Sequence, residues 1–468
     1  MAQESKNHIH ASRTSVSDPS TAPAPVEPDL KTVRKAVGAS AIGNATEWFD
    51  YGLYAVSTAY LTHHFFPGGN GQLWTLSLLA LSFIMRPIGG MVWGPIGDKL
   101  GRKGVLAMTI VLMAGATFCI GLIPDVNTIG VFAPITLAVL RVIQGFSSGG
   151  EYGGAATFMA EYAPDKRRGF YGSFLEFGTL GGFAFGSLIV LIGELTLGND
   201  TMMEWGWRVP FLVAGPLGLI GWYLRSKLSE SPIFEELEDT QRESSMGGGL
   251  RDLFTGHFRQ MSIVFGLVVA VNVVNYTLLT YMPTYLESSV GMESSTTLTV
   301  MFIAQFAMML VMPLGGALSD KIGRKPMWFT SMIALFVLAV PMYMLMAQGF
   351  WFALIGFAVL GLLYIPQLST ISATFPAMFP APVRYAGFAI SYNVSTMIFG
   401  GTSPMVNEAL IGATGNDLVP AYYMMGACLI GFVASLFMKE TKGASLRGTD
   451  VPETGKVPVF EPVAGAAR

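Results

Sequence analysis

A ten-residue phrase occurs twice in this chain, each time in a short basic gap between two long apolar runs. The first copy reads GPIGDKLGRK, from Gly94 to Lys103, and the second reads GALSDKIGRK, from Gly316 to Lys325. The copies are separated by nearly half of the 468 residues. A loop duplicated at this spacing predicts two homologous halves, an arrangement typical of membrane transporters that are built from internal repeats.

The composition also indicates a membrane protein. The chain is 51% hydrophobic and only 13% charged, whereas soluble domains carry about 25% charged residues. The net charge of −3 excludes a basic nucleic-acid binder, so no nucleic-acid partner is expected. Cys119 and Cys428 both lie in apolar runs, which predicts buried thiols rather than a disulfide framework.

The apolar runs are long enough to cross a bilayer, since a spanning helix needs about 20 mostly apolar residues. Twelve stretches qualify, approximately residues 36–62, 72–97, 104–123, 129–152, 169–193, 208–226, 260–286, 295–318, 327–347, 350–374, 385–411 and 419–438. We expect Arg86-Pro87 to break the second stretch, and Pro366 with Pro376 to break the tenth. The sequence therefore predicts an all-α integral membrane protein.

Lysines and arginines collect in alternate gaps between these stretches. The other gaps hold acids and histidines, and their only Lys or Arg is Arg208 at a helix mouth. By the positive-inside rule the basic gaps face the cytoplasm. We therefore expect a multi-pass protein of the cell inner (plasma) membrane with cytoplasmic N- and C-termini.

Polar segments divide the chain into five regions. Residues 1–30 lack an apolar core and predict a disordered cytoplasmic tail, and the polar residues 227–258 predict a cytoplasmic linker. The six-helix bundles are then expected at 31–226 and 259–440, followed by a cytoplasmic tail at 441–468. A second repeated phrase supports the duplication, because APDKRRGF at 163–170 is similar to APVRYAGF at 381–388.

The phrase G-x-x-x-D-K-x-G-R-K resembles the signature loop of the major facilitator superfamily. GNATEWFDYGLY, GGEYGGAATFMAEYAPDKRRGFYGS and WGWRVPF resemble its metabolite:proton symporter family, and the similarity extends over residues 31–440. LLTYMPTYL, PAMFPAPVRY and PAYYMM are most similar to the proline/glycine-betaine proton symporters. The resemblance implies the major facilitator fold, with twelve transmembrane helices in two pseudo-symmetric bundles. It also implies proton-coupled import of zwitterionic compatible solutes by alternating access.

Some osmosensing members of that family end in a long coiled coil. The segment after Lys442 is short, rich in Gly, Pro and Val, and without heptads. We therefore expect the C-terminal tail to lack that device.

Ionisable side chains within the apolar stretches are the main clues to a site, because each costs about 2.5–3.5 kcal/mol at mid-membrane. They must be paired or face water. Most belong to the N-terminal half, namely Glu47, Asp50, Arg86, Arg141, Glu151 and Glu176. The helices of the C-terminal half carry only Glu408 and Arg384, each near a helix end.

A carboxylate is expected to carry the coupled proton, since all five histidines fall outside the expected helices and no Lys lies mid-membrane. The candidates are Glu47, Asp50, Glu151 and Glu176. Glu47 and Asp50 share one face of the first helix with Asn44, Tyr51 and Tyr54, and this polar stripe should line a central cavity. The alternative is a structural hydrogen-bond network.

Substrate contacts are expected from arginines and aromatic residues. Arg86 and Arg141, the latter beside Gln144, could hold a substrate carboxylate. The alternative for Arg141 is a static salt bridge, and the alternative for Arg86 is an anchor near the signature loop. Aromatic rings attract a quaternary ammonium by about 0.5–2 kcal/mol each, although ordinary packing would also explain them. The candidate substrate-binding residues are Arg86, Arg141, Gln144, Asn44, Trp48, Tyr51, Tyr54, Asn272, Tyr276, Tyr281 and Tyr392.

The duplicated loops place matching charges at helix ends. Asp98 with Arg102 in the first copy corresponds to Asp320 with Arg324 in the second. Ion pairs at these positions would hold one side of a transporter shut in one state and break in the other. We expect these four residues to act in gating.

Other classes of function are disfavoured. A primary pump would need a G-x-x-x-x-G-K-[ST] phrase, which is absent, and a membrane enzyme would need a nucleophile or metal cluster that the helices lack. Two buried arginines would equally suit a proton symporter of di- or tricarboxylates such as 2-oxoglutarate or citrate, which is the alternative. The expectation is a monomeric secondary transporter without cofactor or metal, whose partners are a small solute, protons and the lipid bilayer.

Overall fold

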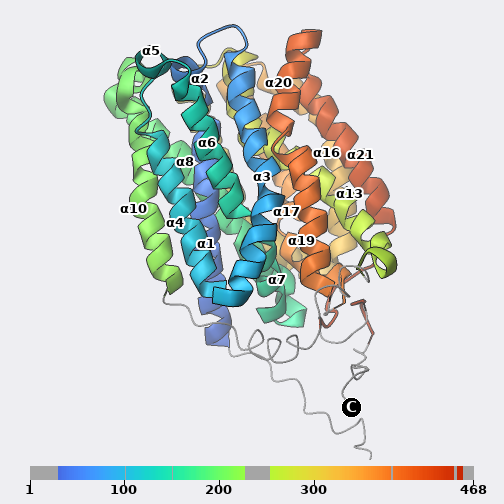
Figure 1. The fold of residues 1–468 in the computed structure, drawn as a ribbon. Helices are drawn as coiled ribbons and strands as arrows, with labels where there is room; N and C mark the ends of the chain where they lie inside the picture. Colours follow the sequence, from blue (N-terminus) through green and yellow to red (C-terminus); the bar gives the residue numbers. More distant parts are fainter. Residues whose placement is uncertain are drawn as a thin grey trace, which may run out of the picture.

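The computed structural model describes residues 30–100, 102–149, 151–226, 253–380, 383–446 and 451–456, and all regular elements in these ranges are helical. Figure 1 shows the helices side by side in one bundle. The start of α1 and the C-terminal segment lie at the same end of the bundle, which we call the terminal face; the other end is the opposite face.

The chain passes repeatedly between these two faces. Before residue 227 its helices are α1 (Leu30–Val56), α2 (Thr58–Phe65), α3 (Gly71–Leu100), α4 (Arg102–Ile120), α5 (Val126–Ile129), α6 (Phe132–Ser148), α7 (Glu151–Tyr162), η2 (Asp165–Arg167), α8 (Arg168–Leu197), α9 (Asn199–Thr201), η3 (Met202–Gly206) and α10 (Arg208–Ser226). After residue 252 they are α13 (Phe258–Asn275), η4 (Tyr276–Tyr281), α14 (Met282–Ser288), α15 (Ser294–Ile322), α16 (Arg324–Met346), α17 (Phe350–Leu368), α18 (Ile371–Thr374), η5 (Pro376–Met378), α19 (Arg384–Ser395), η7 (Thr396–Gly400), α20 (Ser403–Thr414) and α21 (Val419–Leu436).

Seven helical segments of the described chain are long and apolar enough to cross a membrane. They are Gly71–Trp93, Asp165–Leu197, Phe258–Ser288, Ser294–Ile322, Arg324–Met346, Phe350–Thr374 and Val419–Leu436. Other expected spans fall outside this set for local reasons. The fourth is divided at Gly149 between α6 and α7, which have 17 and 12 residues, and α1 carries Glu47 and Asp50 in its second half.

Two details of the expected helices were wrong. Helix α3 runs through Arg86-Pro87 without a break, because a proline removes a single backbone hydrogen bond and α3 packs closely on α6 beside it. His63 and His64, placed outside the helices by the hydropathy pattern, belong to α2. The tenth stretch is interrupted between Pro366 and Pro376, since α17 includes Pro366, ends at Leu368 and is followed by the short α18.

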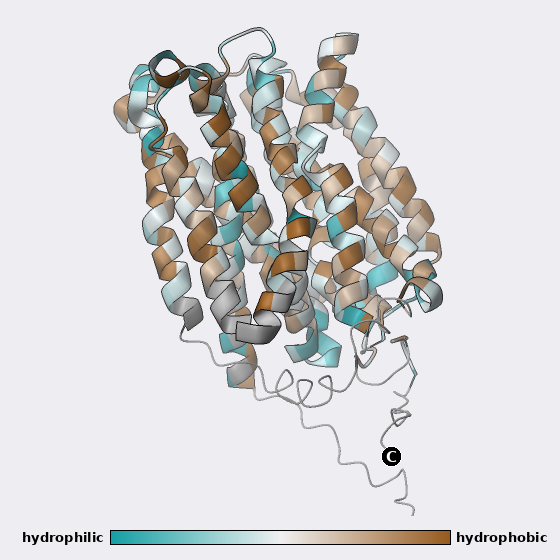
Figure 2. Cartoon of the chain, viewed as in Figure 1, coloured by the Kyte–Doolittle hydropathy of each residue, from teal (hydrophilic) through white to brown (hydrophobic). Residues whose placement is uncertain are grey.

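Large apolar side chains remain exposed along the outer helix faces, among them Trp74, Met91, Leu314 and Trp351. Figure 2 shows hydrophobic residues along the length of the helices facing the viewer. Such a surface would drive a soluble protein to aggregate, whereas lipid tails solvate it. Cys119 lies on this exposed surface rather than in the core, and Cys428 is buried.

Glycines bring α1 and α8 into backbone contact. Gly178, Gly182 and Gly186 recur every fourth residue on α8, so they share one face. A Cβ at Gly182 would lie 2.6 Å from the amide nitrogen of Phe49, and one at Gly186 would lie 2.9 Å from that of Leu53. This small-residue stripe sets how closely the acids of α1 approach those of α8.

The helices contain π-helical turns at two places where the two chain ranges meet. Segment η4 continues α13 and contacts α1, and η7 continues α19 and contacts α3. A π turn holds one more residue than an α turn and often occurs at functional sites. Both π-helical segments therefore indicate that the region where the two chain ranges meet is a candidate functional site.

The glycine stripe gives a test of this packing. We expect Gly182→Ala to lower the thermal unfolding midpoint of the purified protein, because overpacking against a helix backbone costs about 1–3 kcal/mol. Gly181→Ala is the matched control, since its Cβ would meet only the flexible Met309 side chain at 3.4 Å. That variant should be unchanged or slightly more stable, and equal midpoints for the two variants would contradict the packing described here.

Candidate functional site

A small buried cavity lies where the two chain ranges meet at mid-bundle. It is lined by Trp48, Tyr152, Glu176, Thr179, Val271, Asn272, Asn275, Tyr276, Tyr364, Leu368, Ile371 and Tyr392. These side chains come from α1, α7 and α8 on one side and from α13, η4, α17, α18 and α19 on the other. About 10 Å³ of the cavity is wide enough for water, which is room for about one water molecule, so the cavity is closed in this conformation.

Glu176 forms an acidic pole in the cavity wall. Its Oε1 accepts a hydrogen bond from the Tyr152 hydroxyl, and its carboxylate also interacts with the Thr179 hydroxyl. Asn44 donates to Thr179 Oγ1 at 2.6 Å and to the Leu175 carbonyl at 2.7 Å. Asn44 therefore leaves the Thr179 hydroxyl proton free to point at Glu176. Among the described residues, no ion pair joins Glu176 to a Lys or Arg.

Aromatic rings form the rest of the wall. Tyr152 stacks on Tyr392 with ring centroids 4.6 Å apart, and Trp48 lies 6.3 Å from Tyr276. Within the described chain, the Trp48 indole Nε1 and the Tyr276 hydroxyl are buried without a hydrogen-bond partner. A buried donor left unpaired costs about 1–3 kcal/mol, so these two atoms are available to a polar ligand.

Arg86 and Glu47 form a basic pole next to the cavity. The Arg86 Nη2 lies 3.3 Å from the Glu47 Oε1, and both side chains are buried. The guanidinium also lies over the Tyr51 and Phe83 rings, 4.9 and 4.5 Å from their centroids. The Tyr392 hydroxyl, which belongs to the cavity wall, is within electrostatic range of both Glu176 and Arg86.

A second charged network lies outside the cavity. The Arg141 guanidinium is 3.2 Å from the centroid of the Tyr54 ring, and its Nη1 donates to Gln144 Oε1 at 2.8 Å. Gln144 Nε2 in turn donates to Thr117 Oγ1 at 2.6 Å. Asp50 interacts with the same Thr117 hydroxyl and with the Arg141 charge. This network ties α1, α4 and α6 together.

Of the remaining predicted substrate contacts, some line the cavity and others lie outside it. Asn272 lines the cavity and donates to Thr396 Oγ1 at 3.0 Å. Tyr281 does not reach it, since its hydroxyl donates to Glu408 at 2.8 Å nearer the opposite face. Tyr51 lies behind the wall, beside Arg86. Glu151 begins α7, but its side chain lies outside what the structure describes.

Sequence reasoning missed several lining residues. Thr179 could have been found, because it lies three residues after Glu176 and therefore shares its helix face. Tyr364 gave little signal within a very apolar run. Its hydroxyl donates to the Val271 carbonyl at 3.2 Å, which holds the ring against α13.

The terminal face is closed by charged contacts between the two chain ranges. The Asp320 carboxylate accepts from the backbone amides of Gly169 and Phe170, each at 2.9 Å, at the start of α8. It also pairs with Arg324 at 2.7 Å. A carboxylate is stabilised at a helix N-terminus by the unpaired amides and the helix dipole. Asp98 and Arg102 end α3 and begin α4, but their side chains lie outside the described structure.

The C-terminal segment packs onto the same face. Arg168 donates to the Ala444 carbonyl at 2.8 Å, and Arg384 donates to the Leu446 carbonyl at 2.5 Å. Arg384 also pairs with Glu161 at 3.0 Å. The described part of the tail therefore contacts helices of both chain ranges.

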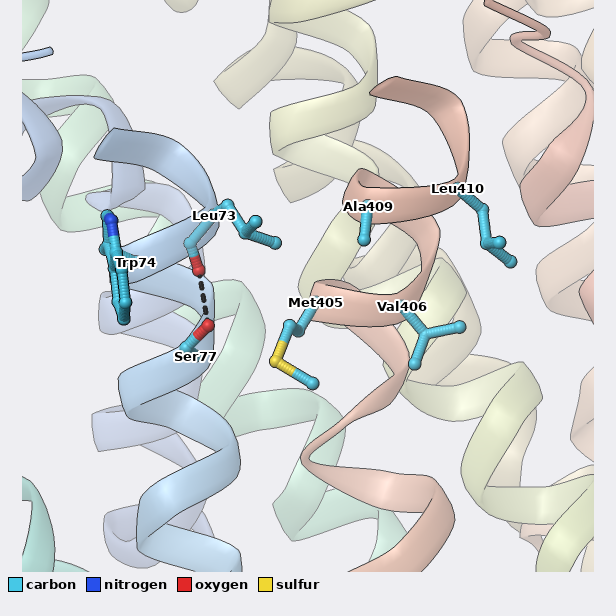
Figure 3. Close-up of a pocket in the computed structure, with 7 residues that line it drawn as sticks. All are labelled: Leu73, Trp74, Ser77, Met405, Val406, Ala409 and Leu410. Atoms are coloured by element: carbon cyan, nitrogen blue, oxygen red, sulfur yellow. Dashed lines mark hydrogen bonds between the residues drawn. The ribbon is translucent and has the colours of Figure 1, made fainter. Parts of the chain in front are cut away.

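A larger hollow lies away from this cavity, between α3 and α20. Figure 3 shows the residues that line it, which are Leu73, Trp74, Ser77, Met405, Val406, Ala409 and Leu410. The Ser77 hydroxyl donates a hydrogen bond to the Leu73 carbonyl at 2.7 Å. None of the described residues that line this hollow is charged.

Comparison with known proteins agrees with this architecture. Residues 41–406 match the Major Facilitator Superfamily. The chain belongs to this superfamily and is a membrane transporter rather than an enzyme.

Relatives of known function extend the match over most of the chain. It is 41% identical over 445 residues to the glycine betaine/proline/ectoine/pipecolic acid transporter of Dickeya dadantii, covering 91% of this chain and 88% of that protein. It is 40% identical, with the same coverage, to the proline/betaine transporter of Salmonella typhimurium. The fold is similar to that of a proton:xylose symporter, with a TM-score of 0.69 at 18% identity, covering 88% of this chain and 97% of the other.

The contact at Asp320 predicts a measurable gate. We expect Asp320→Asn to speed the labelling of a Ser173→Cys reporter by about tenfold, because charged hydrogen bonds contribute roughly 1.5–3 kcal/mol. Ser173 is fully buried against Gly316 in this contact, and labelling by a water-soluble maleimide would measure its exposure. The Ser173→Cys reporter and its Asp320→Asn derivative both carry Cys119→Ser and Cys428→Ala.

Asp417→Asn is the control, since Asp417 is an exposed acid on the opposite face. Labelling rates that rise equally for Asp320→Asn and Asp417→Asn would show that Asp320 does not hold the terminal face shut.

Proposed function

We propose that this protein imports zwitterionic compatible solutes such as proline and glycine betaine together with protons, by alternating access. The observation that carries the proposal is an aromatic cavity that is lined by a buried acid, Glu176, and that has a buried arginine, Arg86, behind its wall at Phe83 and Tyr276. A zwitterion carries a positive charge that Glu176 would attract and a negative charge that Arg86 would attract. The names of the similar transporters from Dickeya and Salmonella support the same class of solute.

The proposed architecture is twelve membrane-spanning helices in two pseudo-symmetric bundles, residues 31–226 and 259–440. Supporting this, the two copies of the duplicated phrase occupy corresponding turns, between α3 and α4 and between α15 and α16. The basic gaps lie at the terminal face, which we propose is cytoplasmic, with tails 1–30 and 441–468 and linker 227–258 on that side. The protein would act as a monomer in the cell inner membrane.

The substrate ammonium is proposed to meet Glu176 and the rings of Trp48, Tyr276 and Tyr392. Cation–π contacts of about 0.5–2 kcal/mol per ring suit an ammonium that cannot donate hydrogen bonds, as in betaine. The substrate carboxylate is proposed to meet Arg86. An arginine fork binds a carboxylate by two parallel hydrogen bonds, which fixes its orientation.

Glu47 is the proposed carrier of the coupled proton. A protonated Glu47 cannot neutralise Arg86, so protonation would free the guanidinium for the substrate carboxylate. Loss of the proton would restore the pair and expel the substrate. Asp50 suits this role less because Arg141 and Thr117 hold it outside the cavity, and Glu176 suits it less because it is needed for the ammonium.

The first test of the coupling is Glu47→Gln in proteoliposomes. This variant mimics the protonated acid, so substrate should still exchange by counterflow at within about threefold of the parent rate, whereas pH-driven accumulation should disappear. Asp50→Asn is the comparison. Full concentrative uptake of labelled proline by Glu47→Gln would refute Glu47 as the carrier.

The second test concerns the acidic pole. Glu176→Gln should weaken betaine binding by about tenfold or more, because two opposite charges about 4 Å apart attract each other by roughly 1–4 kcal/mol between water and a protein surface. Glu408→Gln is the control, since Glu408 binds Tyr281 away from the cavity. Calorimetry on the purified protein would measure both affinities.

A competition panel distinguishes the proposal from the carboxylate alternative. Labelled proline uptake by the parent should be inhibited by betaine and ectoine, and not by 2-oxoglutarate, citrate or shikimate. Inhibition by the carboxylates alone would overturn the zwitterion assignment while leaving the transporter class intact.

A further inference from the structure

Two hydrogen-bond donors in the wall of the central cavity have no acceptor. The Trp48 indole Nε1 and the Tyr276 hydroxyl are buried without a partner among the described residues, and both residues line the cavity. The described chain holds three other buried indole or phenol groups without a partner, those of Trp207, Trp328 and Tyr343. None of these three lines the cavity, so Trp48 and Tyr276 are the two placed where a solute can reach them.

The chemistry of these two groups defines what they can bind. An indole N–H donates and cannot accept, and a phenol hydroxyl carries one proton that it can donate. The hydroxyls of Tyr152 and Tyr364, which also line the cavity, already donate to Glu176 and to the Val271 carbonyl. The two unpaired donors therefore require an acceptor from the solute. An ammonium group has none, whereas a carboxylate offers about four lone-pair sites.

Arg86 does not supply this contact in the closed cavity, because it lies behind the wall. Its guanidinium is 4.5 Å from the centroid of the Phe83 ring, and the Phe83 ring packs edge-on against the Tyr276 ring at 5.1 Å. Arg86 itself does not line the cavity. A carboxylate that accepts one bond from each wall donor keeps about two lone-pair sites for a guanidinium, so the wall donors and Arg86 do not compete for it.

The two donors belong to different chain ranges. Trp48 lies on α1, before residue 227, and Tyr276 opens η4, after residue 252. Their ring centroids are 6.3 Å apart. A single carboxylate bonded to both would therefore join α1 to the π turn and hold the cavity closed around the solute. The faces of the same rings stay available to the ammonium, since the N–H and O–H groups lie at the ring edges.

We propose that the Trp48 indole N–H and the Tyr276 hydroxyl form the carboxylate subsite of the closed cavity, each donating one hydrogen bond to the solute. This role rests on the proposed function, which places a zwitterion in the cavity. The two residues then determine specificity, because a solute without a carboxylate leaves both donors buried and unpaired when the cavity closes.

Tyr276→Phe in the full-length protein removes the hydroxyl and keeps the ring. We expect its affinity for glycine betaine, measured by calorimetry, to fall about tenfold or more, because hydrogen bonds to charged groups are among the stronger ones. Its thermal unfolding midpoint without betaine should stay the same or rise, since the lost hydroxyl had no partner in the protein. Tyr343→Phe is the matched control, because the Tyr343 hydroxyl is also buried and unpaired but lies outside the cavity. Its betaine affinity should equal that of the parent.

Trp48→benzothienylalanine tests the other donor, since sulfur replaces the N–H while both rings remain, and it should weaken betaine binding to a similar extent. Unchanged affinity in both donor variants, an equal loss in Tyr343→Phe, or a lowered midpoint of unliganded Tyr276→Phe would each overturn the subsite. Parent-like betaine binding by the donor variants would leave the proposed function standing, whereas a parent that binds no zwitterion would overturn the proposed function and the subsite together.

Discussion

The cost of placing ionised side chains among helices within a membrane constrains the whole structure. Arg86 and Glu47 are both buried, and removing one partner of such a pair typically costs about 3–5 kcal/mol. Arg141 and Asp50 compensate each other in the same way through Gln144 and Thr117. These compensations fix the positions of α1, α3, α4 and α6, and the glycine stripe of α8 then completes the wall around the cavity.

Much of the fold could be predicted from the sequence because its signals are local and repeated. The apolar runs follow from the cost of exposing polar groups to lipid, the basic gaps from the rule that orients membrane helices, and the duplicated phrase from an internal repeat. The errors occurred where a single residue was taken as decisive. Pro87 does not interrupt α3, and the first helical run continues beyond its apolar stretch through His63 and His64. Tertiary packing decides such positions, and a single sequence does not contain it.

The candidate site was only partly predictable. Helical periodicity placed Glu47 and Asp50 on one stripe, but the two residues have different partners, and only Glu47 borders the cavity through Arg86. Periodicity identifies the face of one helix, whereas a cavity wall depends on how several helices are rotated against each other. For the same reason Tyr281 was grouped with Tyr276, although it bonds Glu408 elsewhere. Tyr364 was missed because only the approach of α17 to α13 gives it a role.

The π-helical segment η4 has a further implication for how the cavity changes shape. Each residue of an α-helix turns by about 100°, so moving the extra residue of a π turn along the helix would swivel every side chain between its old and new locations. Tyr276 opens η4 and forms part of the cavity wall. Moving the π turn would therefore withdraw the Tyr276 ring from a bound solute, while the two ends of the helix kept their packing contacts in the bundle.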